Sequence, residues 1–394
     1  MVYADNAATT KMSRTAIDAM LPYMETHYGN PSSLYRLGQE AAEALQSARE
    51  TVAACLGCTP REITSTSGGS DADNQALISA ARIGERKGKK HIISTAFEHH
   101  AILHTLKKLE KEGFEVELLP VGPIGTVTAQ QVADAIRPDT CLVTIMYANN
   151  EIGSILPIAE IGAVCREKGV LFHTDAVQAA GHLHINVNEQ NIDMLSLSGH
   201  KFHGPKGTGV LYARQGIPLT NIIEGGAQER GKRAGTENVP GIMGLAAALK
   251  EACDHIDENT AKVSALRDQL IAGLSQIPHS ALNGDPVHRL PGNVNFCFEG
   301  IEGESLLLLL DQAGICASSG SACTSGSLDP SHVLLAIGRP HEVAHGSLRL
   351  SLCEWNTQED VDHILKEVPR IVAYLRSISP VWKDLTSGKK QFML

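Results

Sequence analysis

The chain has 394 residues, of which 43% are hydrophobic and 20% are charged, so it can bury a sizeable core. Its formal net charge of −10 argues against nucleic-acid binding through bulk electrostatics. The longest run of leucines, 306–310, is far too short to span a bilayer, and the first six residues lack the basic and apolar regions of a secretory signal. We therefore expect a cytoplasmic protein that has no nucleic-acid or membrane partner.

Strand and helix patterns alternate through the first two hundred residues. Short apolar runs predict strands at 63–66, 91–94, 116–119, 141–146, 170–173 and 194–197. Apolar residues at helical spacing predict helices at 39–56, 73–86, 101–112, 130–136 and 158–168. This alternation predicts an α/β fold with a mostly parallel sheet covered by helices on both faces. In such sheets, ligands bind beyond the carboxyl ends of the strands.

The pattern changes near residue 258. Helices are predicted at 261–274 and 302–313, and alternating strands at 293–298 and 347–352. A last helix is expected to start after Thr357, with Thr357 as its N-cap and Asp360 at the third helical position. This arrangement is typical of a smaller α+β domain.

These patterns predict two domains. We expect a large domain over 15–257 and a small domain formed by 1–14 together with 258–394, which carries a cysteine-bearing loop at about 317–330. The nine cysteines show no framework spacing, so we expect reduced thiols. No second pair accompanies Cys55 and Cys58, and we expect no intrinsic metal centre.

Lys201 lies in a run of small and hydrogen-bonding residues directly after the apolar stretch 192–197. A lysine that loses its hydration there has a lowered pKa and can form a Schiff base with a carbonyl group or with pyridoxal phosphate. A turn lysine that points into solvent is the commoner fate of a single lysine. Whether Lys201 is catalytic or solvent-facing therefore depends on which chemical groups the other motifs place near it.

Several polar groups follow other predicted strands. Gly69 and Ser70 stand between a strand and a helix, where backbone N–H groups can bind an anion or form an ordinary turn. Asp175 ends a buried strand 26 residues before Lys201 and could pair with a protonated pyridine nitrogen or cap a helix. His99 follows a third strand and is a candidate for ring stacking or proton transfer, with a packed or solvated histidine as the alternative.

Two features in the second half of the chain are also chemically informative. The segment 317–327 consists of small residues around Cys323, so this thiol is a candidate nucleophile on an accessible loop, or else a turn cysteine without a role. Arg349 stands within an apolar strand, where a guanidinium group would bind a carboxylate or face water at a sheet edge.

Together, seven motifs in chain order resemble the cysteine desulfurases of the NifS/IscS type, which are fold-type I pyridoxal phosphate enzymes. The motifs span residues 29–33, 98–100, 149–153, 175–178, 198–201, 233–238 and 319–323. The resemblance covers nearly the whole chain and implies a large cofactor-binding domain with a mostly parallel seven-stranded sheet. It also implies L-cysteine as the substrate and pyridoxal 5'-phosphate as the cofactor.

The resemblance assigns roles around the cofactor ring. Lys201 would form the Schiff base, Asp175 would pair with the pyridine nitrogen, and Gln178 would contact the ring hydroxyl. His99 would stack on the ring and move protons. Asn150 would contact the cofactor and orient the substrate.

Other residues would bind the charged groups. The phosphate would be held by Gly69, Ser70, Ser198 and His200, and by Thr236 reaching over from the second subunit of a homodimer. Arg349 would bind the substrate carboxylate.

Cys323 would attack the sulfur of cysteine, carry a persulfide and release alanine. Its sulfur would pass to acceptors such as a U-type iron–sulfur scaffold for cluster assembly, and Cys323 is a possible transient cluster ligand. The physiological acceptor stays open. Other lyase or aminotransferase activity, including activity on selenocysteine, is an alternative, as is a non-catalytic sulfur carrier or scaffold.

Some positions depart from the family pattern. Ser70 and Asp71 replace the usual Thr and Glu, and Ser70 keeps the hydroxyl group. Ala227 replaces a frequent Gly. Cys353 stands where a small residue is usual and is a candidate second oxidisable thiol.

Overall fold

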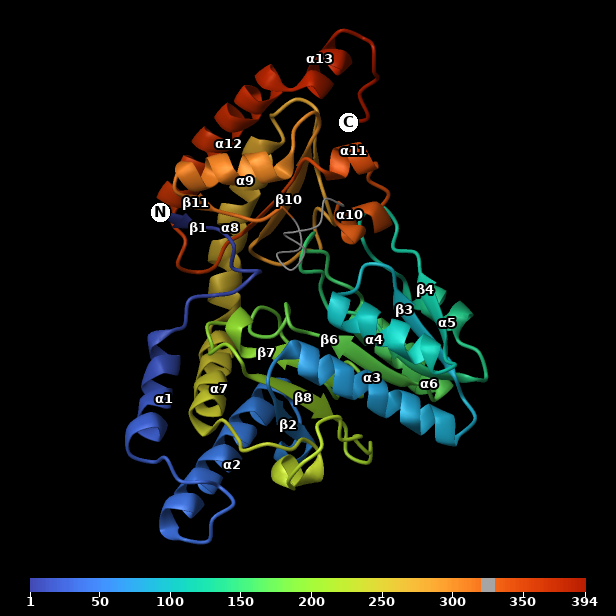
Figure 1. The fold of residues 1–394 in the computed structure, drawn as a ribbon, viewed down its shortest axis with the longest axis vertical. Coiled ribbons are helices and arrows are strands. Elements are labelled where there is room, and N and C mark those ends of the chain that lie inside the picture. The colour runs from blue at the N-terminus through green and yellow to red at the C-terminus, as the bar shows by residue number, and fades with distance from the viewer. Residues whose placement is uncertain (320–329) are drawn as a thin grey trace.

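The computed structural model describes residues 1–319 and 330–394 (Figure 1). Its main element is a seven-stranded sheet with the order β2-β8-β7-β6-β5-β3-β4. The strands are β2 (Ile63–Thr66), β3 (His91–Thr95), β4 (Glu115–Leu119), β5 (Thr140–Thr144), β6 (Leu171–Asp175), β7 (Met194–Ser198) and β8 (Gly209–Ala213). Only β8 runs antiparallel to its neighbours, β2 and β7, so the predicted α/β fold with a mostly parallel sheet is confirmed.

Helices cover both faces of this sheet. They are α1 (Arg14–Glu25), α2 (Arg36–Leu56), α3 (Gly69–Arg86), α4 (His100–Lys111), α5 (Ala129–Ala135), α6 (Ile158–Lys168) and α7 (Val239–Asp254). Successive strand residues point to opposite faces. Ile92 and Met194 therefore belong to a core under α3 and α4, whereas their neighbours Ile93 and Leu195 belong to a core that includes α2, α6 and α7.

A second group of elements lies above the sheet in Figure 1 and includes the N-terminal strand. Its strands are β1 (Val2–Tyr3), β9 (Ser280–Leu282), β10 (Asn293–Phe298), β11 (Ile315–Cys316) and β12 (Ser347–Ser351). Its helices are α8 (Ile256–Leu274), α9 (Gly303–Gln312), α10 (His332–Ala336), α11 (His341–Ala344), α12 (Gln358–Ile378) and α13 (Pro380–Thr386). The order β12-β10-β9 is antiparallel, and β1 pairs with β11 in parallel.

The second group has its own hydrophobic core, which joins Val2 and Ala4 to side chains of α8, α9, α12 and β10. By contrast, Val333 of α10 and Val343 of α11 pack into a core of the main sheet. The predicted division at 15–257 stays a prediction.

Most predicted elements are present within a few residues of their expected bounds, and β2, α6 and β10 match them. Thr357 and Asp360 form the predicted capping box at the start of α12. Three substantial elements, α1, β8 and α7, were not predicted. Within the described parts of the chain, the helices are too short or too polar to cross a bilayer.

Candidate active site

A cavity of about 230 Å³ lies beyond the carboxyl ends of the parallel strands. The loop after β2 contributes Gly69 and Ser70 at the start of α3, the segment after β3 contributes His99, and β6 ends in Asp175. A short 3₁₀ turn after β7, Gly199–Lys201, carries Lys201 into the same cavity. Ten residues predicted for the site line this cavity: Gly69, Ser70, His99, Asn150, Asp175, Gln178, Ser198, His200, Lys201 and Arg349.

The N-terminal segment closes one side of the cavity and contacts Lys201. The Nζ atom of Lys201 donates hydrogen bonds to the carbonyl oxygens of Ala7 at 2.6 Å and Ala8 at 2.9 Å. Gln178 donates to the same Ala7 oxygen at 3.0 Å. The first residues of the chain are thus part of the site.

Arg349 reaches the cavity from β12. It is only 1% exposed, and its Nη2 atom lies 3.0 Å from the Oδ1 atom of Asp5 while Nη1 donates to the carbonyl oxygen of Asn150. Its buried Nε atom has no hydrogen-bond partner among the residues that the structure describes. The site therefore holds a fixed positive charge with an unused donor, as binding of a carboxylate requires.

Asp175 is a buried carboxylate at the end of β6. Burial raises its pKa to about 6, although the Val177 N–H, which lies 2.9 Å from Oδ1, and the charge of Lys201 oppose this shift. The carboxylate thus gains from a cationic partner in the cavity.

Behind Asp175 lies a buried polar group that the sequence did not predict. Burial, followed by the Asp175 charge, raises the pKa of Asp73 well above its usual range, and burial lowers the pKa of His173 to about 3. The two side chains approach to 3.7 Å, and His173 Nε2 also contacts Ser196 Oγ at 3.0 Å. Both shifts favour the uncharged forms of these side chains, which limits the negative charge beside Asp175.

The two histidines in the cavity are uncharged. Burial and the nearby Lys201 lower the pKa of both His99 and His200 to about 4. His99 Nδ1 accepts the Ala101 N–H and caps α4, so the proton of the neutral ring is on Nε2. His200 Nδ1 contacts Thr9 Oγ1 at 3.1 Å.

One predicted site residue that the structure describes does not line this cavity, and another cannot be placed. Thr236 is exposed and does not line it. Cys323 lies outside the described residues. The structure adds lining residues that sequence reasoning missed: Ala7, Ala8, Asp73, Met146, Ala148 and Val177. Of these six, only Asp73 could have been predicted from the sequence. It stands four residues after Gly69, which places both residues on the same face of α3.

The residues present fit pyridoxal phosphate. Helix α3 starts at the cavity without a side-chain cap, so its first N–H groups can bind a phosphate. A Cβ atom on Gly69 would lie 2.7 Å from Val177 Cγ2, so the backbone has to come this close without a side chain. Asp175 and Lys201 supply the carboxylate and the amine that the cofactor needs.

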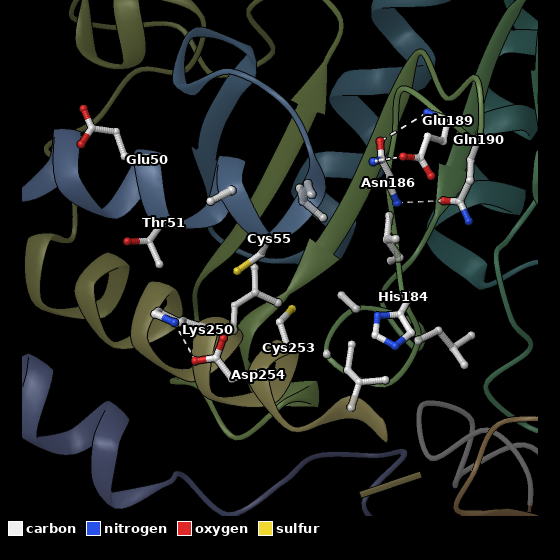
Figure 2. Close-up of a pocket in the computed structure, with 18 residues that line it drawn as sticks. Glu50, Thr51, Cys55, His184, Asn186, Glu189, Gln190, Lys250, Cys253 and Asp254 are labelled. Atoms are coloured by element: carbon white, nitrogen blue, oxygen red, sulfur yellow. Dashed lines mark hydrogen bonds and ion pairs between the residues drawn. The ribbon is translucent and has the colours of Figure 1, made fainter. Parts of the chain in front are cut away.

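A larger pocket of about 850 Å³ lies elsewhere, between α2, α7 and the segment 183–190. Figure 2 shows the thiols of Cys55 and Cys253 near each other on its wall. It is lined by none of the predicted site residues, so its size does not make it the candidate active site.

The fold and the site define a class of protein: a model of the class-V aminotransferases matches residues 2–364, and the chain belongs to this family. Among curated proteins, the cysteine desulfurase IscS of Methanosarcina thermophila is 55% identical over 380 residues, which cover 96% of this chain and 94% of the relative. A solved NifS-like protein has a TM-score of 0.89 and 38% identity, covering 95% of this chain and all of the other. The solved structure of SspA in complex with cysteine has a TM-score of 0.79 and 36% identity. The match covers 91% of this chain and 100% of the SspA chain.

Proposed function

We infer that the chain is a pyridoxal phosphate-dependent cysteine desulfurase, which converts L-cysteine to L-alanine and takes up the sulfur. The main support for this conclusion is that one cavity is lined by ten of the residues predicted for the active site, which come from several strand ends and from β12. The class-V family and the cysteine desulfurase relative at 55% identity support it.

We propose that the cofactor is held at both ends. The start of α3, with Ser198 and His200, would bind the phosphate, and Asp175 would pair with the pyridine nitrogen. Gln178 would contact the ring hydroxyl, and Lys201 would bond to the cofactor. When bound, pyridoxal phosphate withdraws electrons from the substrate's Cα.

Arg349 and Asn150 are proposed to orient the substrate. The fixed guanidinium of Arg349 suits the carboxylate of an amino acid, and Asp5 keeps it in place. Lys201 is placed to move a proton at Cα. His99, neutral and with its proton on Nε2, is placed to exchange a proton without adding charge.

The sulfur acceptor on the protein is proposed to be Cys323, on the ground of the family resemblance. Its thiolate attacks the substrate sulfur, so a new S–S bond forms as the Cβ–S bond breaks, and a proton completes the methyl group of alanine. Onward transfer would go to a U-type scaffold for iron–sulfur cluster assembly.

A homodimer is part of this proposal. Thr236 is exposed outside its own cavity, which suits a residue that completes the partner's phosphate site. Large apolar side chains are also exposed around the α1–α2 connection: Leu21, Met24, Tyr28, Leu34 and Tyr35. Burying such a patch against a second copy would stabilise the dimer.

Replacing Lys201 by alanine tests the cofactor assignment. We expect Lys201→Ala to lose the visible absorbance of the bound cofactor and to lower alanine formation from cysteine by about 10³-fold or more. Lys206→Ala removes an exposed lysine five residues later and is the matched control. Equal absorbance and activity in the two variants would contradict the assignment.

Replacing Cys323 by serine tests the sulfur acceptor. Cys323→Ser should still bind L-cysteine and change the cofactor spectrum, but it should release little sulfide with dithiothreitol present. Cys58→Ser, which removes a half-buried thiol elsewhere in the chain, should turn over normally. Full turnover by Cys323→Ser would exclude Cys323 as the nucleophile, and a preference for selenocysteine in parallel assays would redefine the substrate.

A further inference from the structure

A second cluster of chemically reactive side chains lies outside the active-site cavity. His203, Cys353 and Glu354 bring one nitrogen, one sulfur and one oxygen atom within 4.8 Å of one another. All three line a separate cavity of about 30 Å³, which is large enough for a water molecule or a metal ion.

The imidazole of His203 is oriented as a ligand. Its Nδ1 atom lies 2.8 Å from the carbonyl oxygen of Lys11 and donates to it, which leaves the lone pair of the neutral ring on Nε2. His203 is 5% exposed, and no described residue gives Nε2 a hydrogen bond of good geometry. Nε2 nevertheless lies only 3.2 Å from Glu354 Oε1.

The backbone holds His203 in an uncommon conformation. Its φ of 64° is in the left-handed region, which is uncommon for residues other than glycine, although histidine adopts it more often than most. The His203 N–H donates to Thr10 Oγ1, and its carbonyl oxygen accepts from Ser13 N, each at 2.9 Å. Residues held in such conformations cluster at functional sites.

The other two residues, Cys353 and Glu354, lie in the segment that follows β12. The Cys353 N–H donates to Asn356 Oδ1 at 2.9 Å, and the Cys353 side chain is 7% exposed. The ring of Trp355 lies 4.1 Å from that of His203, centroid to centroid, and packs against it.

The chemistry of the cluster suits a cation. Glu354 Oε1 lies 3.2 Å from His203 Nε2, and the three ligand atoms lie within 4.8 Å of one another. A thiol and a carboxyl group, each able to lose a proton, thus lie beside the imidazole nitrogen at a small cavity.

We propose that His203 Nε2, Cys353 Sγ and the Glu354 carboxylate bind a borderline divalent cation of the Zn²⁺ class, with water as a fourth ligand. Imidazole, thiolate and carboxylate are the three ligand types that Zn²⁺ prefers, and tetrahedral coordination brings them to the separations seen here. This site goes beyond the sequence-based expectation of no intrinsic metal centre.

The position of the cluster gives the ion a structural consequence. His203 follows Lys201 by two residues, and Cys353 follows Arg349 by four. A bound ion would link the chain segment that carries the cofactor lysine to the segment that carries the guanidinium group. His182 also lines the small cavity, but its Nε2 atom is in contact with the Lys201 carbonyl oxygen at 3.1 Å.

Metal titration of the purified holoenzyme tests the proposal. Co²⁺ should bind at one equivalent per chain with the visible spectrum of a tetrahedral sulfur-ligated ion, and Zn²⁺ should displace it. Cys353→Ser and His203→Asn should each weaken Zn²⁺ binding about 100-fold. Asparagine is chosen because it tolerates a positive φ. Cys323→Ser should retain the site, which separates it from any binding at Cys323.

Two outcomes would overturn the proposal: no stoichiometric binding by the wild-type protein, or binding that both cluster substitutions leave unchanged. Crystals of the wild-type protein grown with Zn²⁺ give a readout that does not depend on variant folding. An anomalous zinc peak bonded to the three atoms supports the site. A zinc peak elsewhere, or none, rejects it.

Discussion

Asp175 shows how a single residue sets the affinity of the site. Its carboxyl group is buried and raised in pKa to about 6 by that burial, so ionising it in the folded protein is costly. A protonated pyridine nitrogen offsets this cost. Below its pKa, Asp175 is neutral, and cofactor binding has to remove a proton from it.

We therefore predict that the affinity for pyridoxal phosphate falls as pH drops below about 6, by about tenfold per pH unit at most. Apoenzyme titrated with pyridoxal phosphate between pH 5 and 8 measures this. Asp175→Asn should bind weakly at every pH and lack this part of the pH dependence. An identical pH profile in the two proteins would contradict the role of Asp175.

Single residues also show which parts of the site could be predicted from the sequence and which could not. Lys201 and Asp175 could be predicted because each follows a recognisable strand, and strand ends meet at one edge of a parallel sheet. The carbonyl groups of Ala7 and Ala8 could not, because a backbone oxygen has no sequence signature. The pairing of Asp5 with Arg349 joins residues 344 apart in the chain, and local patterns cannot reveal such a contact.

Among the helices and strands, α12 begins at a residue that could be predicted from the sequence, Thr357. The Thr357 side chain accepts from the Asp360 N–H, and Asp360 Oδ2 accepts from the Thr357 N–H at 3.1 Å. These two bonds satisfy N–H groups that a helix leaves unpaired at its first turn.

Removing this cap should destabilise the protein without changing the site. Thr357→Ala is expected to lower the free energy of unfolding by about 1 kcal/mol, measured by urea unfolding of the holoenzyme. Thr386→Ala is the control, because Thr386 is exposed at the end of α13, where its hydroxyl bonds to carbonyl oxygens of its own helix. Equal midpoints for the two variants would show that the cap contributes little.

Among the strands of the main sheet, β8 is the one that sequence patterns did not predict, and this failure has a physical cause. It is a five-residue apolar run that is separated from the Lys201 turn by residues 202–208 and runs antiparallel to β7. A βα alternation predicts only parallel neighbours. The antiparallel direction of β8 is set by tertiary structure. β8 lies between β2 and β7, and Thr66 and Ser198 both pair with Gly209.

For the whole molecule, the position of Thr236 makes the dimer testable by complementation. If Thr236 acts in the partner's site, a heterodimer of one Lys201→Ala chain and one Thr236→Ala chain contains one doubly defective site and one intact site. We predict about half of the wild-type activity for this heterodimer, isolated with two different affinity tags, and little for either parent homodimer. Activity no higher than the mean of the parents would place Thr236 in its own chain's site.

The N-terminal segment adds a consequence for biosynthesis. The Asn6 side chain donates to the carbonyl oxygen of Ser351, 345 residues later, and the Ala7 N–H donates to the Ser351 hydroxyl. The wall that contacts Lys201 therefore cannot close until nearly the whole chain has left the ribosome, on the order of 20–70 s after Asn6 is made at ordinary elongation rates. The complete cofactor site therefore forms late in translation. On a ribosome stalled before β12, the central sheet would lack the N-terminal wall of its binding site.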